Sequence, residues 1–136
     1  MIAALLELIV PRAMIVTPNS VEAHRLGGAK RLLERGSRYV LVTGTHEASS
    51  EVINKLYDAR GVVREDRWPR LPGSYHGAGC TLASAIAAAL ANGLDVPAAA
   101  RDAQDYTWQA LSNGFRPGKG QLIPDRLFRL RETESK

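Results

Sequence analysis

Two short apolar runs with a helical stretch between them limit most strongly what this chain can fold into. Residues 13–16 and 39–42 are apolar and rich in β-branched side chains, and each run is soon followed by proline or glycine. Runs of this kind are typical of buried strands. Residues 20–26 and 29–35 carry helical patterns that are separated by glycines. The order strand, helix, strand favours a parallel pair in an α/β sheet with both faces covered.

The flanking segments fit the same class. Residues 2–10 predict the end of an apolar helix, which Pro11 closes. Residues 52–58 and 62–68 contain good strand formers on either side of Arg60-Gly61, and they predict a hairpin or an edge pair. The expected fold is therefore α/β, with a mostly parallel sheet that carries a hairpin or edge pair.

The second half of the chain is expected to be mainly helical. Residues 77–92 are rich in alanine and apolar nearly all round, which predicts a buried helix ended by Asn92-Gly93. Asp95 fits an N-cap for a helix that runs to about Leu111. A loop with a short ordered segment at 126–130 is expected to follow.

Composition narrows the class of protein. With 136 residues, 45% of them apolar, the chain is expected to form one folded domain over residues 1–136. The longest apolar run, at 85–91, is far shorter than the roughly 20 residues of a membrane span. The first residues lack the basic start of a signal peptide, and the single cysteine excludes an intrachain disulfide. We therefore expect a cytoplasmic protein that acts on small molecules.

The net charge of +4 is concentrated near the C-terminus. Residues 114–136 hold six Lys and Arg against three Asp and Glu, so three of the four excess positive charges lie there. We expect this segment to be a basic, solvated loop and tail. Because no recognition motif accompanies the basic residues, we expect neither nucleic acid nor a membrane as a partner.

The most informative motif is His76-Gly77-Ala78-Gly79-Cys80-Thr81, which leads into the apolar helix. Two glycines let a ligand approach the backbone, and the first amides of a helix have no internal acceptors. With the helix dipole they form a site suited to phosphate, and a thiol placed there is favoured as thiolate. The alternative is an ordinary glycine-rich helix start with a small buried cysteine. Neither the Walker A spacing nor the dinucleotide-binding spacing is present.

Two further motifs follow the predicted parallel strands. Asn19 and Glu22, after the first strand, could hold Mg²⁺ through water. The same pair also fits a capping box at a helix start. Residues 43–46, Thr-Gly-Thr-His, follow the second strand and could border a nucleotide or form an ordinary strand-to-loop turn. No two histidines have metal-ligand spacing.

In order and spacing, the three motifs together resemble the hydroxymethylpyrimidine/phosphomethylpyrimidine kinase family of thiamine biosynthesis, within the ribokinase-like superfamily. Residues 11–23 are similar to the family's Asn-x-x-Glu segment, residues 39–46 to its nucleotide-side strand, and residues 76–88 to its anion-hole helix. Each motif alone is unspecific, whereas the combination is specific. The fold that this resemblance implies is the C-terminal half of a ribokinase-like, Rossmann-like three-layer domain.

The resemblance implies ATP-dependent phosphorylation of a hydroxymethyl group or a phosphate on an aminopyrimidine. Gly77, Ala78 and Gly79 would supply anion-hole amides for the transferring phosphoryl group. Cys80 would take the place where sugar-kinase relatives use an aspartate as base. Such a site works by positioning and by stabilising charge, because phosphoryl transfer needs little covalent help.

The resemblance also assigns roles to the two strand-end motifs. Asn19 and Glu22 would organise Mg²⁺ and the phosphates, with Mg²⁺ held through water. Thr43, Gly44 and Thr45 would bind on the nucleotide side. Many members of the family have lysine where this chain has Thr43, so one cation on the nucleotide side is missing.

The resemblance covers only the C-terminal half of the family's domain. In the family, the N-terminal half supplies the first strands and most of the pyrimidine pocket. We therefore expect impaired activity from this chain alone, and either a homo-oligomer or pairing with an N-terminal half. Two alternatives stay open: another vitamin-precursor kinase such as a pyridoxal kinase, and a catalytically silent module that binds phosphate or nucleotide.

Overall fold

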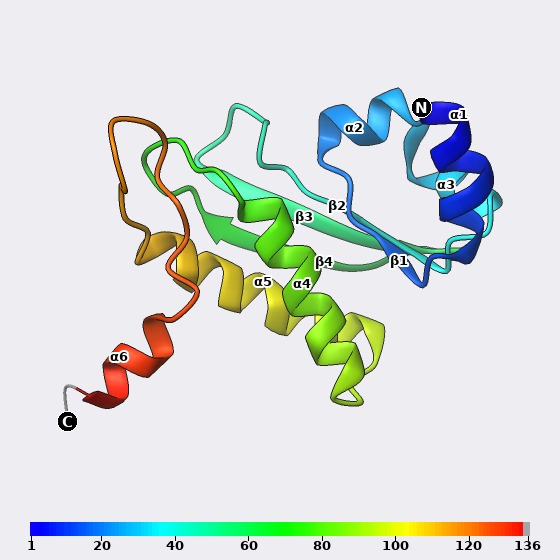
Figure 1. Cartoon of the computed structure of the whole chain (residues 1–136). Helices are drawn as coiled ribbons and strands as arrows, with labels where there is room; N and C mark the ends of the chain where they lie inside the picture. Colours follow the sequence, from blue (N-terminus) through cyan, green and yellow to red (C-terminus); the bar gives the residue numbers. More distant parts are fainter. Residues whose placement is uncertain (135–136) are drawn as a thin grey trace. The chain divides into compact units, whose positions relative to one another are not determined.

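A computed structural model describes residues 1–134 and divides the chain into two compact units (Figure 1). The first unit is Met1–Arg70, and the second begins at Leu71. The single domain expected over residues 1–136 stays a prediction, and so does the solvated tail at 114–136. Residues 135 and 136 of that tail lie outside the described residues.

The first unit is built on a four-stranded sheet with the order β1-β2-β3-β4. Its strands are listed in chain order: β1 Ile15–Val16, β2 Tyr39–Val42, β3 Glu51–Asp58 and β4 Gly61–Pro69. The parallel pair β1–β2 and the hairpin β3–β4 are both confirmed. The hairpin joins β2 in antiparallel fashion, so the described sheet is mixed where mostly parallel pairing was expected. The α/β class is confirmed.

Short helical segments accompany this sheet. They are α1 Ile2–Ala4, η1 Leu5–Ile9, η2 Val10–Arg12, α2 Ser20–Arg25 and α3 Gly28–Glu34. Residues 2–10 are helical as expected, and the helical turns continue to Arg12, so Pro11 lies in the last, tighter turn rather than after it. Gly27 separates α2 from α3, because its φ of 92° is in the left-handed region that favours glycine.

The core of the first unit joins the N-terminal turns to the sheet. Leu6 and Val10, four residues apart on one side of the N-terminal turns, are buried together with Leu32 of α3 and Val40 of β2. Val16 of β1 packs against this group. The contacts hold α1–η2 and α3 to the parallel strands, so the ends of β1 and β2 have a rigid support.

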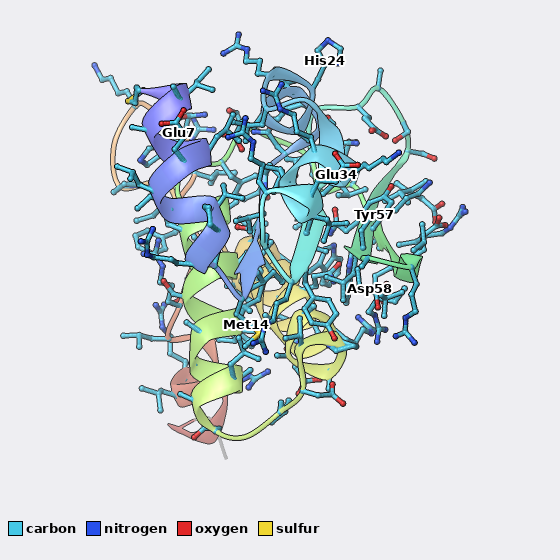
Figure 2. All side chains as sticks on the ribbon, turned by 90° about the vertical axis from the view of Figure 1, so that its right-hand side faces the viewer. Glu7, Met14, His24, Glu34, Tyr57 and Asp58 are labelled. Carbon is cyan, nitrogen blue, oxygen red and sulfur yellow. The ribbon has the colours of Figure 1, made fainter. Side chains whose placement is uncertain are left out.

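The other side of the N-terminal turns is apolar and exposed. Leu8 and Ile9 are 58% and 59% exposed, although leucine and isoleucine are usually buried. We call the following exposed side chains the N-terminal apolar surface: Met1, Ile2, Leu5, Leu8, Ile9 and Met14. Met14 directly precedes β1 (Figure 2), and β1 pairs with β2 alone among the described strands. An apolar surface beside a sheet edge is a place where other polypeptide can bind.

The second unit is mainly helical, as expected, with α4 Ala78–Ala91, α5 Val96–Ser112 and α6 Phe128–Glu134. Asp95 caps α5, since its Oδ1 accepts from the Ala98 N–H at 2.9 Å. Helices α4 and α5 pack against each other. The expectation that α4 is buried nearly all round is wrong: only Thr81, Leu82 and Ile86 are buried, and the alanines of its other faces are partly or fully exposed.

The segment between α5 and α6 is held by short backbone ladders. Phe115 and Ile123 exchange two backbone hydrogen bonds, and Tyr75 forms a parallel bridge with Leu122. The expected ordered segment at 126–130 becomes α6, which begins at Phe128 and continues beyond the predicted end. Among the described residues, the helices are all too short or too polar to cross a membrane.

The core of the first unit can be tested with two leucines of different burial. Leu32 is fully buried, so Leu32→Ala is expected to lower the free energy of unfolding by about 2–5 kcal/mol. The control Leu127→Ala is expected to change it by less than about 0.5 kcal/mol, because Leu127 is 60% exposed and lies outside the N-terminal apolar surface. Urea denaturation followed by circular dichroism measures both. Equal losses in the two variants would contradict this description of the core.

Candidate functional site

The first turn of α4 presents unoccupied backbone donors. Gly77 is its N-cap, with a φ of 89° in the left-handed region, and no side chain caps the helix. The first intrahelical bond runs from the Thr81 N–H to the Gly77 carbonyl at 3.0 Å. Within the described part of the chain, the N–H groups of Ala78, Gly79 and Cys80 donate to no acceptor. Such amides, aligned with the helix dipole, attract an anion.

Cys80 lies in this first turn and is exposed. The alternative of a small buried cysteine that only fills space is therefore wrong. A thiol at the start of a helix, open to solvent, can meet a ligand that binds the neighbouring amides. The sequence placed Cys80 correctly beside the amides, and the structure adds its accessibility.

Sequence reasoning missed Arg126, whose side chain contacts the first turn of α4 although the residue follows α5 in the sequence. Its Nε donates to Oγ1 of Thr81 at 3.0 Å, and a side-chain carbon added to Gly77 would lie 2.9 Å from its Nη2. Tyr106 of α5 also donates to the Arg126 carbonyl at 2.8 Å. A cation thus lies next to the open amides, and a side chain at position 77 would displace its guanidinium. No sequence signal joins positions that lie so far apart along the chain.

An open pocket of about 580 Å³ adjoins this cation within the second unit. Its lining residues are Thr81, Ser84, Ala85, Ala88, Ala89, Asp102, Ala103, Asp105, Tyr106, Arg126 and Arg129. Arg129 lies over the ring of Tyr106, 5.3 Å from its centroid. The volume is within the range of small-molecule sites, and the lining carries charges of both signs.

Asn19 and Glu22 form the capping box of α2. The Glu22 N–H donates to Asn19 Oδ1 at 2.8 Å, and the Asn19 N–H donates to Glu22 Oε2 at 2.9 Å. The capping box that the sequence offered as the alternative to a Mg²⁺ site is therefore present. It uses one carboxylate oxygen of Glu22, and the other, Oε1, makes no hydrogen bond within the described residues.

The structure brings Asn19 and Thr43 together at the ends of the parallel strands. The two residues form a parallel bridge. The Thr43 N–H donates to the Pro18 carbonyl and the Ser20 N–H donates to the Thr43 carbonyl, both at 3.0 Å. The two strand-end motifs are thus one contiguous group, as expected of the carboxyl ends of neighbouring parallel strands.

Gly44 has a structural reason to be glycine. A side-chain carbon at this position would lie 2.5 Å from the carbonyl oxygen of Ile53 in β3, which is a backbone atom that cannot move away. Its N–H donates to Oδ1 of the buried Asn54 at 3.1 Å. Gly44 therefore seats the end of β2 against β3. Thr45 follows in an exposed turn, which matches the strand-to-loop alternative for this motif.

No cluster of metal-ligating side chains marks this site within the part of the chain that the structure describes. Among the described residues, no three His, Cys, Asp or Glu side chains gather as metal ligands, and His24 points into solvent (Figure 2). The carboxyls with a clearly lowered pKa are on the hairpin. Hydrogen bonds from the backbone and side chain of Arg60 lower the pKa of Asp58, and the Arg67 guanidinium lowers that of Glu65.

The chain is similar to known proteins of one family. The profile of the phosphomethylpyrimidine kinase family matches residues 1–125. The chain belongs to this family. A hydroxymethylpyrimidine/phosphomethylpyrimidine kinase of Streptomyces coelicolor is 37% identical over 128 residues, which cover 82% of this chain and 46% of that protein. The family and the C-terminal position of the match confirm the resemblance drawn from the motifs.

A pyridoxine kinase and a pyridoxal kinase are also similar. A pyridoxine kinase of Bacillus subtilis is 33% identical, with 82% of this chain and 46% of that protein covered. The structure of a Bacillus subtilis pyridoxal kinase in an ADP complex matches with a TM-score of 0.88 and 28% identity, over 95% of this chain and 56% of that one. The chain spans about half the length of these relatives. The ribokinase-like fold is confirmed.

The role of Gly44 can be tested by a methyl group. Gly44→Ala is expected to lower the free energy of unfolding by roughly 1–3 kcal/mol, because the added carbon overlaps the backbone of Ile53. The control Gly118→Ala meets no atom within 4 Å and is expected to change stability by less than about 0.5 kcal/mol. Thermal and urea denaturation measure both. A Gly44→Ala protein as stable as the control would contradict the close approach of β3.

Proposed function

We propose that this chain is the ATP-binding half of a hydroxymethylpyrimidine/phosphomethylpyrimidine kinase. The reaction is transfer of the γ-phosphoryl group of ATP to the hydroxyl or phosphate of an aminopyrimidine. The observation that carries the proposal is the start of α4, with its open amides, its left-handed Gly77 and the adjacent Arg126. Family membership, over residues 1–125, supplies the reaction class.

In this proposal the start of α4 stabilises the transferring phosphoryl group. The amides of Gly77, Ala78, Gly79 and Cys80 point donors at its oxygens, and the Arg126 guanidinium adds a positive charge. Fixed donors of this kind are effective because they need no reorganisation during transfer. Cys80, exposed in the same turn, occupies the place of the base that accepts the proton of the acceptor hydroxyl. The backbone of residues 43–45 borders the nucleotide.

Mg²⁺ would be held from the start of α2. Glu22 Oε1 makes no hydrogen bond within the described residues, so one carboxylate oxygen is available while the capping box stays intact. One carboxylate with a neighbouring amide is a sparse ligand set. Mg²⁺ usually keeps several waters and binds through one or two carboxylates and the substrate phosphates, so the set fits contact through water.

A pyridoxine kinase is the second candidate. It is favoured by the 33% identity to the Bacillus subtilis pyridoxine kinase and by the close match to a solved pyridoxal kinase. Both candidates use the same phosphoryl-transfer site, so the α4 geometry does not separate them. Assays with hydroxymethylpyrimidine and with pyridoxine, under the same conditions, distinguish the two.

The N-terminal apolar surface is proposed as the docking place of the polypeptide that corresponds to the other half of the relatives. The relatives are about twice as long as the matched region. Met14 of this surface directly precedes β1, which pairs with β2 alone among the described strands. An apolar surface and an open strand edge favour association in water. Without that polypeptide, a second copy of this chain is expected to cover the surface.

Gly77 can be compared with a second left-handed glycine. Gly77→Ala and Gly93→Ala both place a side chain at a φ near 90°, but only the Gly77 side chain would meet Arg126. Both variants are expected to lose roughly 1–2 kcal/mol of stability. Only Gly77→Ala is expected to weaken ATP binding, by roughly 10–100-fold. The added methyl group displaces the Arg126 guanidinium, so its charged hydrogen bonds to the phosphates are lost. Calorimetric titration with ATP measures this affinity. Equal ATP affinities in Gly77→Ala and Gly93→Ala would refute the anion site.

The Mg²⁺ role of Glu22 can be separated from its capping role. Glu22→Gln keeps an oxygen that can accept the Asn19 N–H, and it removes the charge. We expect the Mg²⁺-dependent part of ATP affinity to fall by about tenfold, with unchanged melting temperature and unchanged affinity in EDTA. The control Glu34→Gln removes a charge from α3 and should leave all three values as they are. A lower melting temperature of Glu22→Gln with unchanged Mg²⁺-dependent ATP affinity would show that Glu22 acts only as a helix cap.

The chain alone is expected to associate and to be a poor kinase. Sedimentation velocity should show oligomers, and Leu8→Lys should shift them to monomer by charging the N-terminal apolar surface. The control Leu130→Lys charges a leucine of the second unit that is 61% exposed, and it should leave the oligomers unchanged. A wild-type monomer that turns over hydroxymethylpyrimidine at roughly 1–100 s⁻¹, as kinases typically do, would refute the requirement for a second half.

A further inference from the structure

The side chain of Arg70, at the end of the first unit, donates hydrogen bonds to several backbone carbonyls of the loop at residues 45–50, which follows β2. Its Nε donates to the Ser49 carbonyl at 2.6 Å, its Nη1 to the Thr45 carbonyl at 2.8 Å, and its Nη2 to the Glu47 carbonyl at 2.7 Å. Longer contacts of 3.4 Å reach three more oxygens, the carbonyls of Gly44 and Glu51 and the Ser49 hydroxyl. The three short bonds carry the interaction, because hydrogen bonds weaken quickly beyond about 3.2 Å.

Apart from Arg70, the loop at residues 45–50 is held by one side-chain bond, from the Ser49 hydroxyl to the Glu51 carbonyl, and by a few backbone bonds. Every one of these residues is exposed, and the only apolar side chain among them is that of Ala48. Its backbone bonds are two local ones, Glu47 N–H to Gly44 O and Ser49 N–H to Glu47 O, both at 3.1 Å. The Arg70 N–H adds a third, to Ser50 O. Without buried side chains, such a loop opens at low cost unless a polar group holds it.

The guanidinium suits this task because of its shape. It is planar and directs five donors in a fixed fork, whereas a lysine ammonium is a single point on a flexible stem. Among the described residues Arg70 forms no ion pair, so carbonyl oxygens are its protein partners. Three carbonyls at alternate positions along the loop, those of Thr45, Glu47 and Ser49, are thus held by one side chain.

We propose that Arg70 is a positioning residue that fixes the 45–50 loop and, through it, the backbone of Gly44 and Thr45. The part of this inference that concerns ATP rests on the function proposed above, in which that backbone borders the nucleotide. A loop that is in the binding shape for only a fraction of the time lowers the apparent affinity by that fraction. Arg70 therefore acts on nucleotide affinity without touching the nucleotide.

The loop itself is tested by cleavage of the full chain after Glu47 with a glutamate-specific protease. Arg70→Met removes all three short bonds, and Arg70→Lys keeps the charge without the fork. The control Arg60→Met removes an arginine from the far end of the same hairpin, where it pairs with Asp58 and is 90% exposed. We expect cleavage after Glu47 to be at least about tenfold faster in both Arg70 variants and unchanged in Arg60→Met.

Two results would overturn the loop assignment. One is an unchanged rate after Glu47 in Arg70→Met. The other is an equal acceleration after Glu65 in β4, because that would report opening of the whole sheet. Recovery of the wild-type rate by Arg70→Lys would assign the effect to charge, which also contradicts the role of the fork.

ATP affinity, measured by calorimetry on the same proteins, tests the nucleotide part. About tenfold weaker binding in both Arg70 variants, with Arg60→Met unchanged, supports it. Faster cleavage with wild-type ATP affinity would overturn it. If the wild-type chain binds no ATP, the proposed function fails together with the nucleotide part, and the cleavage rates still decide whether Arg70 holds the loop.

Discussion

The parallel contact between the ends of β1 and β2 is the constraint on which the first unit depends. It is short, because β1 has only two residues, and the Asn19–Thr43 bridge extends it past the strand ends. That bridge brings the start of α2 beside the turn after β2. The buried cluster of Leu6, Val10, Leu32 and Val40 packs against Val16 of β1 and Val42 of β2 and so supports this contact. Polar groups far apart in sequence are thereby held in one place.

In the second unit, a few residues at the start of α4 form the candidate anion site. Helix α4 needs an N-terminus that no side chain occupies, and Gly77 provides this by taking a left-handed backbone. The same glycine leaves room for Arg126, which Thr81 holds by a hydrogen bond to Nε. Dipole, open amides and a cation then act on the same small volume. Charge stabilisation is the main task of a phosphoryl-transfer site, so this economy fits the proposed reaction.

Arg70 and Arg126 both lack a carboxylate partner among the described residues, and their partners differ. Arg70 binds the carbonyls of a loop, and Arg126 lies at a helix N-terminus where like charge is unfavourable in the absence of an anion. The second placement costs stability in the free protein and is offset when an anion binds. Arg60 and Arg67, by contrast, pair with carboxylates on the hairpin and lower the pKa of Asp58 and Glu65.

The sequence by itself determined the elements and the family. Strand propensity and glycine positions located β1, β2, the hairpin and the two long helices, and the spacing of three motifs identified the kinase family. These features are local, or repeat at fixed separations, so a single chain reveals them. The tertiary structure alone decided that Cys80 is exposed, that Gly44 faces the backbone of β3, and that Arg70 and Arg126 reach their partners. Those contacts depend on backbone atoms brought together from distant positions, and a sequence pattern carries no record of such distances.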